Sequence, residues 1–97
     1  MKVTFRRIAA AELREAVAWY QLRQTGLGLD LRDEVDRVIQ GIVEHPDRWA
    51  IYHKEIRRAV VRRFPYLLYY DIRLGEIRVF RIVHTSRDPL PVKDLLP

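Results

Sequence analysis

Cysteine and asparagine are absent from this 97-residue chain, and serine occurs only once. The missing thiols exclude disulfides, thiolate metal sites and cysteine nucleophiles, and their absence is typical of a reducing compartment. We therefore expect a cytoplasmic protein. No apolar run approaches the roughly 18 residues of a membrane span, and the charged N-terminus lacks the apolar region of a secretory signal. Contact with a membrane is not expected.

Several kinds of active site are also poorly supported. The three histidines, His45, His53 and His84, lack the spacing typical of metal ligands, so no metal is expected. Ser86 follows His84 closely, but nothing resembling a nucleophile elbow surrounds it, which disfavours a serine hydrolase. The Gly-Leu-Gly turn at residues 26–28 follows a helical pattern rather than a strand, and no third glycine follows it. A nucleotide fold is therefore not supported, and we expect no cofactor.

The residues that are present are those of an ordinary globular domain. Hydrophobic residues make up 48% of the chain and charged residues 32%, unlike the composition of a disordered chain. A chain of this length has room for one hydrophobic core. We expect a single domain over residues 1–97, with an irregular tail over residues 89–97.

Positive charge is concentrated in the second half of the chain. The net charge is +5, and residues 56–88 hold eight basic and three acidic side chains. Fifteen of the 18 basic residues are arginines, which bind phosphate or carboxylate groups in a bidentate fork. This surplus favours an acidic partner. A genomic bias towards arginine explains the same composition equally well.

Hydrophobic periodicity predicts a strand and two helices in the first half of the chain. Residues 1–7 alternate between apolar and polar side chains, as in a half-buried strand. Residues 9–24 lack glycine and proline and repeat apolar side chains at helical spacing. After the glycine turn, a second helix is expected to begin with Asp30 as its N-cap and to end at Pro46. Its predicted apolar stripe consists of Leu31, Val35, Val38, Ile39 and Ile42.

The second half of the chain predicts strands. After a loop over residues 46–54, the runs at residues 56–64, 66–73 and 76–84 are rich in valine, isoleucine, tyrosine and phenylalanine. Turns at Pro65 and Gly75 are short enough to make an antiparallel meander. The order β-α-α-β-β-β gives an α+β fold in which a helical hairpin covers one face of a sheet.

Arginines and aromatic residues interleave on these predicted strands. Alternation along one strand places Arg58 and Arg62 on one side, and Arg57 and Arg63 on the other. An exposed, basic face with interspersed tyrosines is typical of surfaces that hold a nucleic-acid backbone. Alternatively, these arginines pair with acidic residues of the sheet and of the second helix, as on an ordinary solvated surface.

Three segments of the sequence form one pattern: GLGLDLRDEVDRVIQGIVEHPDR, IRRAVVRRFPYLLYYDI and RIVHTSRDP. In them the chain resembles the ParE branch of the RelE/ParE toxin superfamily, which belongs to type II toxin-antitoxin and plasmid stabilisation systems. The resemblance covers almost the whole chain. It implies a RelE/ParE-like fold and a small basic toxin that arrests growth and that a co-expressed antitoxin neutralises. ParE-like members inhibit DNA gyrase, whereas RelE-like members cut mRNA on the ribosome.

The sequence favours a gyrase inhibitor over a ribonuclease. Metal-independent RNA cleavage needs an acid, a base and cations that stabilise the phosphorane. RelE-type nucleases place basic residues where this chain has Leu67 and Val60, and an aromatic residue where it has Lys93. The residues left for an endoribonuclease are His84, Arg87, Arg58 and Tyr70. A diverged, non-toxic member of the superfamily is a third interpretation.

Two further sets of residues follow from this resemblance. The target-binding set collects arginines of the sheet region: Arg87, Arg81 and Arg62. The antitoxin-binding set collects apolar side chains left over on the hairpin and in the tail: Trp19, Leu22, Leu27 and Leu95, with Leu90 and Leu96 nearby. We expect an acidic antitoxin that folds on this surface, with an amphipathic helix beside the hairpin, giving a hetero-oligomer. Charge reversal at Arg87, or loss of the tail after Pro89, should reduce toxicity with the fold intact.

Overall fold

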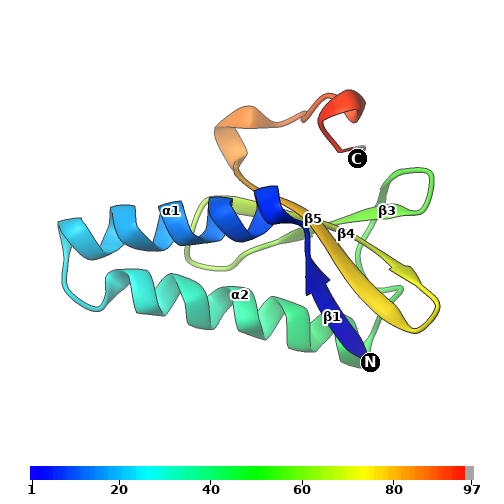
Figure 1. Ribbon diagram of the computed structural model, residues 1–97, viewed down its shortest axis with the longest axis horizontal. Coiled ribbons are helices and arrows are strands. Elements are labelled where there is room, and N and C mark those ends of the chain that lie inside the picture. The colour runs from blue at the N-terminus through cyan, green and yellow to red at the C-terminus, as the bar shows by residue number, and fades with distance from the viewer. Residues whose placement is uncertain (96–97) are drawn as a thin grey trace.

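A five-stranded sheet and a helical hairpin make up the fold of residues 1–95, the part of the chain described by the computed structural model (Figure 1). The chain order is β1 (Lys2–Phe5), α1 (Arg7–Arg23), α2 (Leu27–Glu44), β2 (Ile51–His53), β3 (Ile56–Val60), β4 (Tyr66–Arg73) and β5 (Glu76–His84). Two short 3-10 turns follow, at Thr85–Arg87 and Val92–Asp94. The strand order in the sheet is β1-β5-β4-β3-β2. The predicted α+β class is confirmed.

Strands β2 to β5 form an antiparallel meander, and β1 joins its far edge in parallel with β5. Val3 lies opposite Ile77 in that parallel pair. The helical hairpin carries the chain from β1 at one edge of the sheet to β2 at the other. Because consecutive strands β3, β4 and β5 are neighbours, short turns suffice between them, as at Gly75 with its φ of 73°.

The hairpin turns tightly at Gly26, whose φ of 91° lies in the left-handed region. Helix α2 starts directly after it, so the prediction that Asp30 caps the helix is wrong: Gly26 is the N-cap, and Asp30 lies within the first turn. A carboxylate there still stabilises the positive end of the helix dipole. The two helices pack closely, because a Cβ at Gly28 would lie 2.2 Å from the carbonyl oxygen of Val17.

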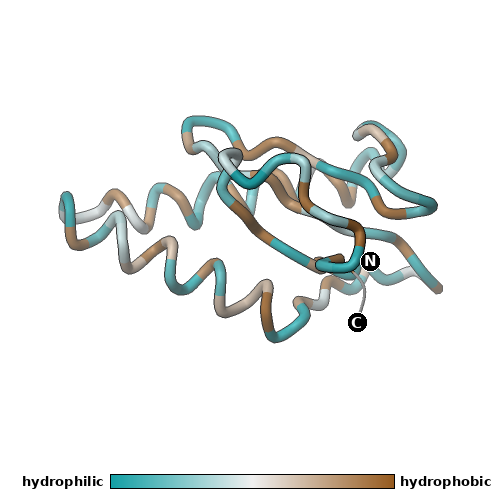
Figure 2. The backbone as a smooth tube through the Cα atoms, turned by 90° about the horizontal axis from the view of Figure 1, so that it is seen from above, coloured by the Kyte–Doolittle hydropathy of each residue, from teal (hydrophilic) through white to brown (hydrophobic). Residues whose placement is uncertain are grey.

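The main core lies between the hairpin and one face of the sheet. Four of the five stripe positions on α2 are buried and Ile39 is half-buried, which confirms most of the predicted stripe. Hydrophobic and hydrophilic positions alternate along both helices (Figure 2), as expected for helices with one buried side. From the sheet, the main core receives Ala59, Leu68, Tyr70, Ile77, Val79 and Ile82.

A second, smaller core lies on the other face of the sheet. There the tail covers Ile56, Leu67, Tyr69, Phe80 and Val83 with the buried side chains of Leu90 and Leu95. The tail lies on the side of the molecule away from α2 (Figure 1). Three hydrogen bonds to its carbonyl oxygens hold it: Tyr52 Oη donates to Leu90 (2.7 Å), Arg81 Nη1 to Asp94 (2.9 Å) and Arg6 Nη1 to Leu95 (2.8 Å).

The meander differs from its prediction at two places. The segment predicted as a loop at residues 46–54 contains β2, a short edge strand. The strand predicted over residues 56–64 ends at Val60, because the chain turns there with Arg63 in the left-handed region (φ 69°). Arg62 and Arg63 therefore lie outside β3, and the predicted alternation fails for them. Pro65 has no amide hydrogen to donate to a neighbouring strand. The same turn buries Phe64 in the main core.

The bounds of β4 and β5 coincide with their predictions, whereas α1 begins at Arg7 rather than Ala9. Within residues 1–95 there is no helix whose length and apolar character would let it cross a membrane.

Candidate functional site: a groove between α1 and the end of β5

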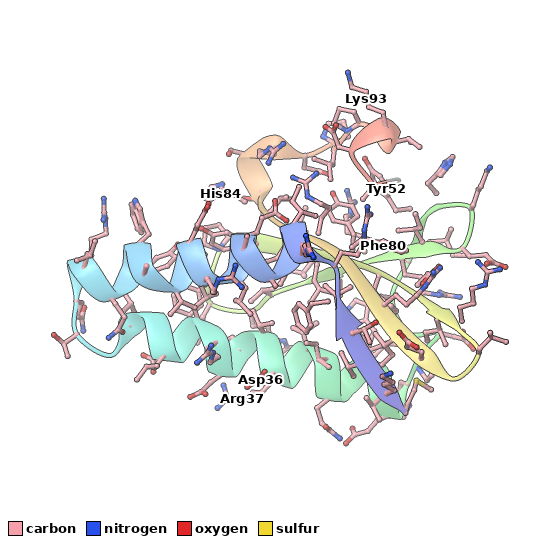
Figure 3. All side chains as sticks on the ribbon, in the orientation of Figure 1. Asp36, Arg37, Tyr52, Phe80, His84 and Lys93 are labelled. Atoms are coloured by element: carbon pink, nitrogen blue, oxygen red, sulfur yellow. The ribbon has the colours of Figure 1, made fainter. Side chains whose placement is uncertain are left out.

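A groove of about 380 Å³ lies between α1 and the C-terminal end of β5. Figure 3 shows His84 next to α1, just above that helix in the view. The groove is lined by Glu12, Glu15, Ala16, Trp19 and Tyr20 of α1, by Tyr66 of β4, by Ile82, Val83 and His84 of β5, and by Arg87. It combines aromatic rings, carboxylates and two basic side chains, so it can hold both apolar and polar groups of a partner.

Four rings form a continuous row along this groove. Ring centroids are 4.9 Å apart for Trp19 and Tyr20, 6.3 Å for Tyr20 and Tyr66, and 5.4 Å for Tyr66 and His84. All three pairs meet edge to face, the arrangement that the ring quadrupoles favour. Burial raises the pKa of the Tyr66 hydroxyl, and the neighbouring Tyr20 adds to the rise. Tyr66 therefore stays a neutral hydroxyl at physiological pH.

His84 is exposed, and Ser86 fixes the direction of its ring. The backbone amide of Ser86 donates to His84 Nδ1 at 3.0 Å, and Ser86 Oγ lies 3.0 Å from the same nitrogen. Because Nδ1 accepts a hydrogen bond, the proton of the neutral ring sits on Nε2. Nε2 is then a hydrogen-bond donor for a partner.

Arg81 and Glu12 form a buried ion pair beneath this groove. Arg81 is 5% exposed and donates to Glu12 through Nε (3.0 Å) and Nη2 (2.8 Å). The amide of Ile82 donates to the same carboxylate at 3.0 Å. The hydrogen bond to Glu12 raises the pKa of Arg81. A target-binding role for Arg81 stays a prediction, and its guanidinium is enclosed by α1 and the tail.

The other two arginines of the predicted target-binding set are exposed. The Arg87 side chain is 51% exposed, with Nη1 4.0 Å from Glu12 Oε2 at the end of the groove. Arg62 lies on the turn after β3 and lines a different groove, beside α2. The structure thus does not bring the three arginines into one site, and Arg87 alone belongs to the groove at β5.

The predicted ribonuclease residues are dispersed. His84 lies opposite Tyr66 in the β4–β5 register, whereas Tyr70 lies opposite Val79. Tyr70 is fully buried among the helices, where its hydroxyl donates to the carbonyl oxygen of Pro46 at 3.0 Å. Burial raises the pKa of Tyr70, although Arg57 opposes the rise. The structure therefore does not bring His84 and Tyr70 together.

Arg58 lies on the opposite face of the sheet from Tyr70. Its guanidinium pairs with the carboxylate of Asp88 and lies 4.9 Å from the ring centre of Tyr52. Lys93, which stands where RelE-type nucleases have an aromatic residue, points away from the body of the molecule (Figure 3). None of these side chains completes an acid–base pair with His84.

The predicted antitoxin-binding residues fall into two groups. Trp19 and Leu22 of α1 are 49% and 85% exposed, and Leu27 is half-buried beside them at the hairpin turn. The tail residues Leu90 and Leu95 are fully buried in the second core, so the expectation that they are bare is wrong. Leu96 lies outside the described residues. A role for Leu95 in binding an antitoxin stays a prediction, and it would require the tail to lift.

Sequence reasoning missed Glu12, Tyr20 and Tyr66 as groove residues. Tyr66 belongs to the Arg-Phe-Pro-Tyr segment that carried the family resemblance, so its position was a usable signal. Glu12 gave no such signal, because its partner Arg81 is 69 positions away in the chain. Within residues 1–95, no group of three or more histidine, aspartate or glutamate side chains is arranged to hold a metal ion.

The α+β fold is that of a RelE/ParE-like toxin, and comparison with known proteins gives the family. The model of a family described as the ParE toxin of type II toxin-antitoxin system, parDE, matches residues 3–89. The chain therefore belongs to the ParE toxin family and is the toxin component of a type II module.

Solved structures show the same fold. The chain is similar to a structure described as "Chromosomal ParDE TA system from P. aeruginosa", with a TM-score of 0.73 and 18% identity, over 87% of this chain and 95% of that one. Comparison with curated protein sequences gives no match.

Proposed function

We propose that this chain acts by inhibiting DNA gyrase without catalysis, and that a cognate antitoxin neutralises it. Membership of the ParE toxin family supports this target, since ParE-like toxins inhibit gyrase. The observation that carries the proposal is the separation of Tyr70 from His84. Tyr70 is buried under the helices and bonded to Pro46, so His84 has no acid–base partner among the predicted ribonuclease residues. Cleavage of RNA without a metal needs such a pair.

The groove between α1 and β5 is the proposed contact for gyrase. It presents a half-exposed guanidinium at Arg87 and an exposed imidazole at His84 beside a row of rings. A cation with adjacent aromatic surface is the combination that protein interfaces favour as an energetic centre. The antitoxin is proposed to cover the adjoining hairpin surface, where Leu22 leaves apolar area bare and where Trp19 also borders the groove.

A supercoiling assay tests the gyrase target directly. Purified chain added to gyrase, relaxed plasmid and ATP should inhibit supercoiling in a dose-dependent way. The same preparation added to a reconstituted translation reaction should leave the mRNA intact. Intact supercoiling together with cleaved mRNA would instead establish the ribonuclease. The antitoxin is tested through the adjacent open reading frame, whose product should bind the chain and restore supercoiling.

A further inference from the structure

A second groove, of about 420 Å³, lies between α2 and the outer end of β3, away from the groove at β5. It is lined by Glu34, Arg37, Val38 and Gly41 of α2, by Arg48 and Trp49 of the following loop, and by Val60 and Arg62 at the end of β3. The function proposed above makes no use of these residues.

The groove carries a surplus of positive charge. Arg48 and Arg62 are exposed, and within residues 1–95 neither forms an ion pair. The one carboxylate of the lining, Glu34, already binds Arg37 at 3.0 Å and Arg63 at 3.3 Å. Two guanidinium groups are therefore left for an acidic ligand. Guanidinium groups bind carboxylates with strong, charge-assisted hydrogen bonds.

Apolar surface lies between these charges, and it is held in place. Val60 is 59% exposed. The six-membered ring of the Trp49 indole packs against α2 at Gly41. A Cβ atom on residue 41 would lie only 2.9 Å from the ring carbon Cη2, too close for an ordinary contact. Arg57 Nη1 donates to the carbonyl oxygen of Trp49 at 2.6 Å, which fixes the loop. The absence of a side chain at Gly41 thus lets the indole form a preformed apolar wall.

The outer edge of β3 is also free at this point. The amide of Arg58 donates outwards to Ala50, and the amide of Val61 donates inwards to Tyr66. The amide and carbonyl groups of successive residues point to opposite edges of a strand. Those of Val60 therefore point to the same outer edge as those of Arg58. Strand β2 reaches only from Ile51 to His53, opposite Arg57 and Ile56, and within residues 1–95 no strand pairs with this side of β3 at Val60. Such an edge accepts an extended segment of another polypeptide.

We propose that this groove binds an extended, acidic polypeptide segment. Its backbone pairs with Val60, an apolar side chain packs on Trp49 and Val60, and flanking carboxylates bind Arg48 and Arg62. A nucleic acid fits less well, because it offers no backbone amide and carbonyl to a strand edge.

Fluorescence of Trp49 tests the proposal on the full chain. Trp19→Phe leaves Trp49 as the sole tryptophan. The probe is a short capped peptide with a central valine flanked by glutamates. Its titration should change the Trp49 emission saturably. Replacing the glutamates by lysine, or methylating the valine amide nitrogen, should each weaken binding by about tenfold or more, because charge-assisted and edge hydrogen bonds are lost.

Matched variants separate this site from a general attraction of opposite charges. Arg48→Glu combined with Arg62→Glu should weaken peptide binding by at least about tenfold. Arg73→Glu combined with Arg14→Glu makes the same change in net charge at other exposed arginines and should leave binding nearly unchanged. Equal loss in both pairs, or no saturable signal with the peptide, would overturn the proposal.

A single-stranded oligonucleotide serves as the competing probe. It should not compete with the peptide at physiological salt, and displacement of the peptide would assign the groove to nucleic acid instead. Gyrase inhibition is measured in a separate assay. A chain that does not inhibit gyrase can still be tested for peptide binding at this groove, and a chain that does not bind the peptide can still be tested for gyrase inhibition.

Discussion

Two arginines near the end of β5 have opposite environments. Arg81 is buried and holds Glu12 of α1 and the carbonyl of Asp94 in the tail, so it joins three segments of the chain. Arg87 is half-exposed and supports no part of the core. Removing one partner of a buried pair leaves an uncompensated charge, whereas an exposed side chain can change at little cost to stability. Arg87 is therefore the residue at which function can be tested apart from folding.

Arg87→Glu should abolish or strongly reduce gyrase inhibition while the thermal midpoint stays close to that of the unchanged protein. The charge reversal removes the cation at the end of the groove and places a carboxylate near Glu12. Supercoiling assays and circular dichroism measure the two effects. Arg73→Glu, at an exposed position outside the groove, is the matched control. Loss of activity accompanied by loss of the folded spectrum would remove Arg87 from the functional site.

Tyr69 and Tyr70 are adjacent, fully buried residues that face opposite sides of the sheet. Tyr70 Oη donates to Pro46 at 3.0 Å, whereas Tyr69 Oη has no hydrogen-bond partner within residues 1–95. Tyr70→Phe should lower the free energy of unfolding by about 1 kcal/mol, and Tyr69→Phe should leave it unchanged or raise it. Urea denaturation of the two variants decides this. A larger cost for Tyr69→Phe would show that its hydroxyl finds a partner in solution.

Among the elements, the tail contributes more than its irregular sequence indicates. Leu90 and Leu95 cover Tyr69 and Phe80, and three donor side chains bind the tail carbonyls. Deleting the tail would expose this second core to water. The expectation that loss of the tail leaves the fold intact is thus at odds with the packing. A toxicity loss after truncation would not by itself identify a binding residue.

Leu95→Ala should lower the free energy of unfolding by about 2–5 kcal/mol, because Leu95 is fully buried and its removal leaves a cavity. Small domains have only about 5–15 kcal/mol of stability in total, so the variant should melt at a clearly lower temperature. Leu74→Ala, at a fully exposed turn residue, is the control. A negligible effect of Leu95→Ala would mean that the tail is detached in solution.

At the scale of the whole molecule, buried tyrosines couple stability to alkaline pH. Burial raises the pKa of Tyr66, Tyr69 and Tyr70 above the ordinary value of 10.0. Above pH 10 the unfolded chain releases these protons more readily than the folded protein, so the unfolded state is favoured. Stability should be retained below about pH 10 and fall as the pH rises further. The urea midpoint measured across this range should fall less steeply in Tyr70→Phe than in the unchanged protein.

Net charge and the bare hairpin surface should act on different steps of antitoxin binding. The chain carries +5, whereas Trp19 and Leu22 offer apolar contact area. Long-range attraction speeds encounter and is screened by salt, while buried apolar contacts slow dissociation. Raising the salt concentration should therefore lower the association rate with little change in dissociation. Leu22→Ala should mainly raise the dissociation rate in surface plasmon resonance. A dissociation rate that changes with salt but not with Leu22→Ala would contradict this assignment of the two steps.

The sequence by itself determined the elements whose signals are local. Helical spacing on α2 predicted four of its buried residues, and the runs at Tyr66–Arg73 and Glu76–His84 predicted strands β4 and β5 to the residue. Local turn chemistry at Gly26 and Gly75 marked where the chain reverses. The family resemblance also followed from contiguous segments, because a motif of neighbouring residues is readable without a fold.

Only the tertiary structure decided which distant residues meet. Glu12 and Arg81 are 69 positions apart, and nothing local indicates their pairing. The burial of Leu95 depends on how the tail crosses the sheet, and the separation of His84 from Tyr70 depends on the β4–β5 register. Likewise, the turn at Arg63 removes Arg62 from β3, so strand alternation could not place it. Long-range contacts arise from the packing of whole elements, which periodicity along the chain does not encode.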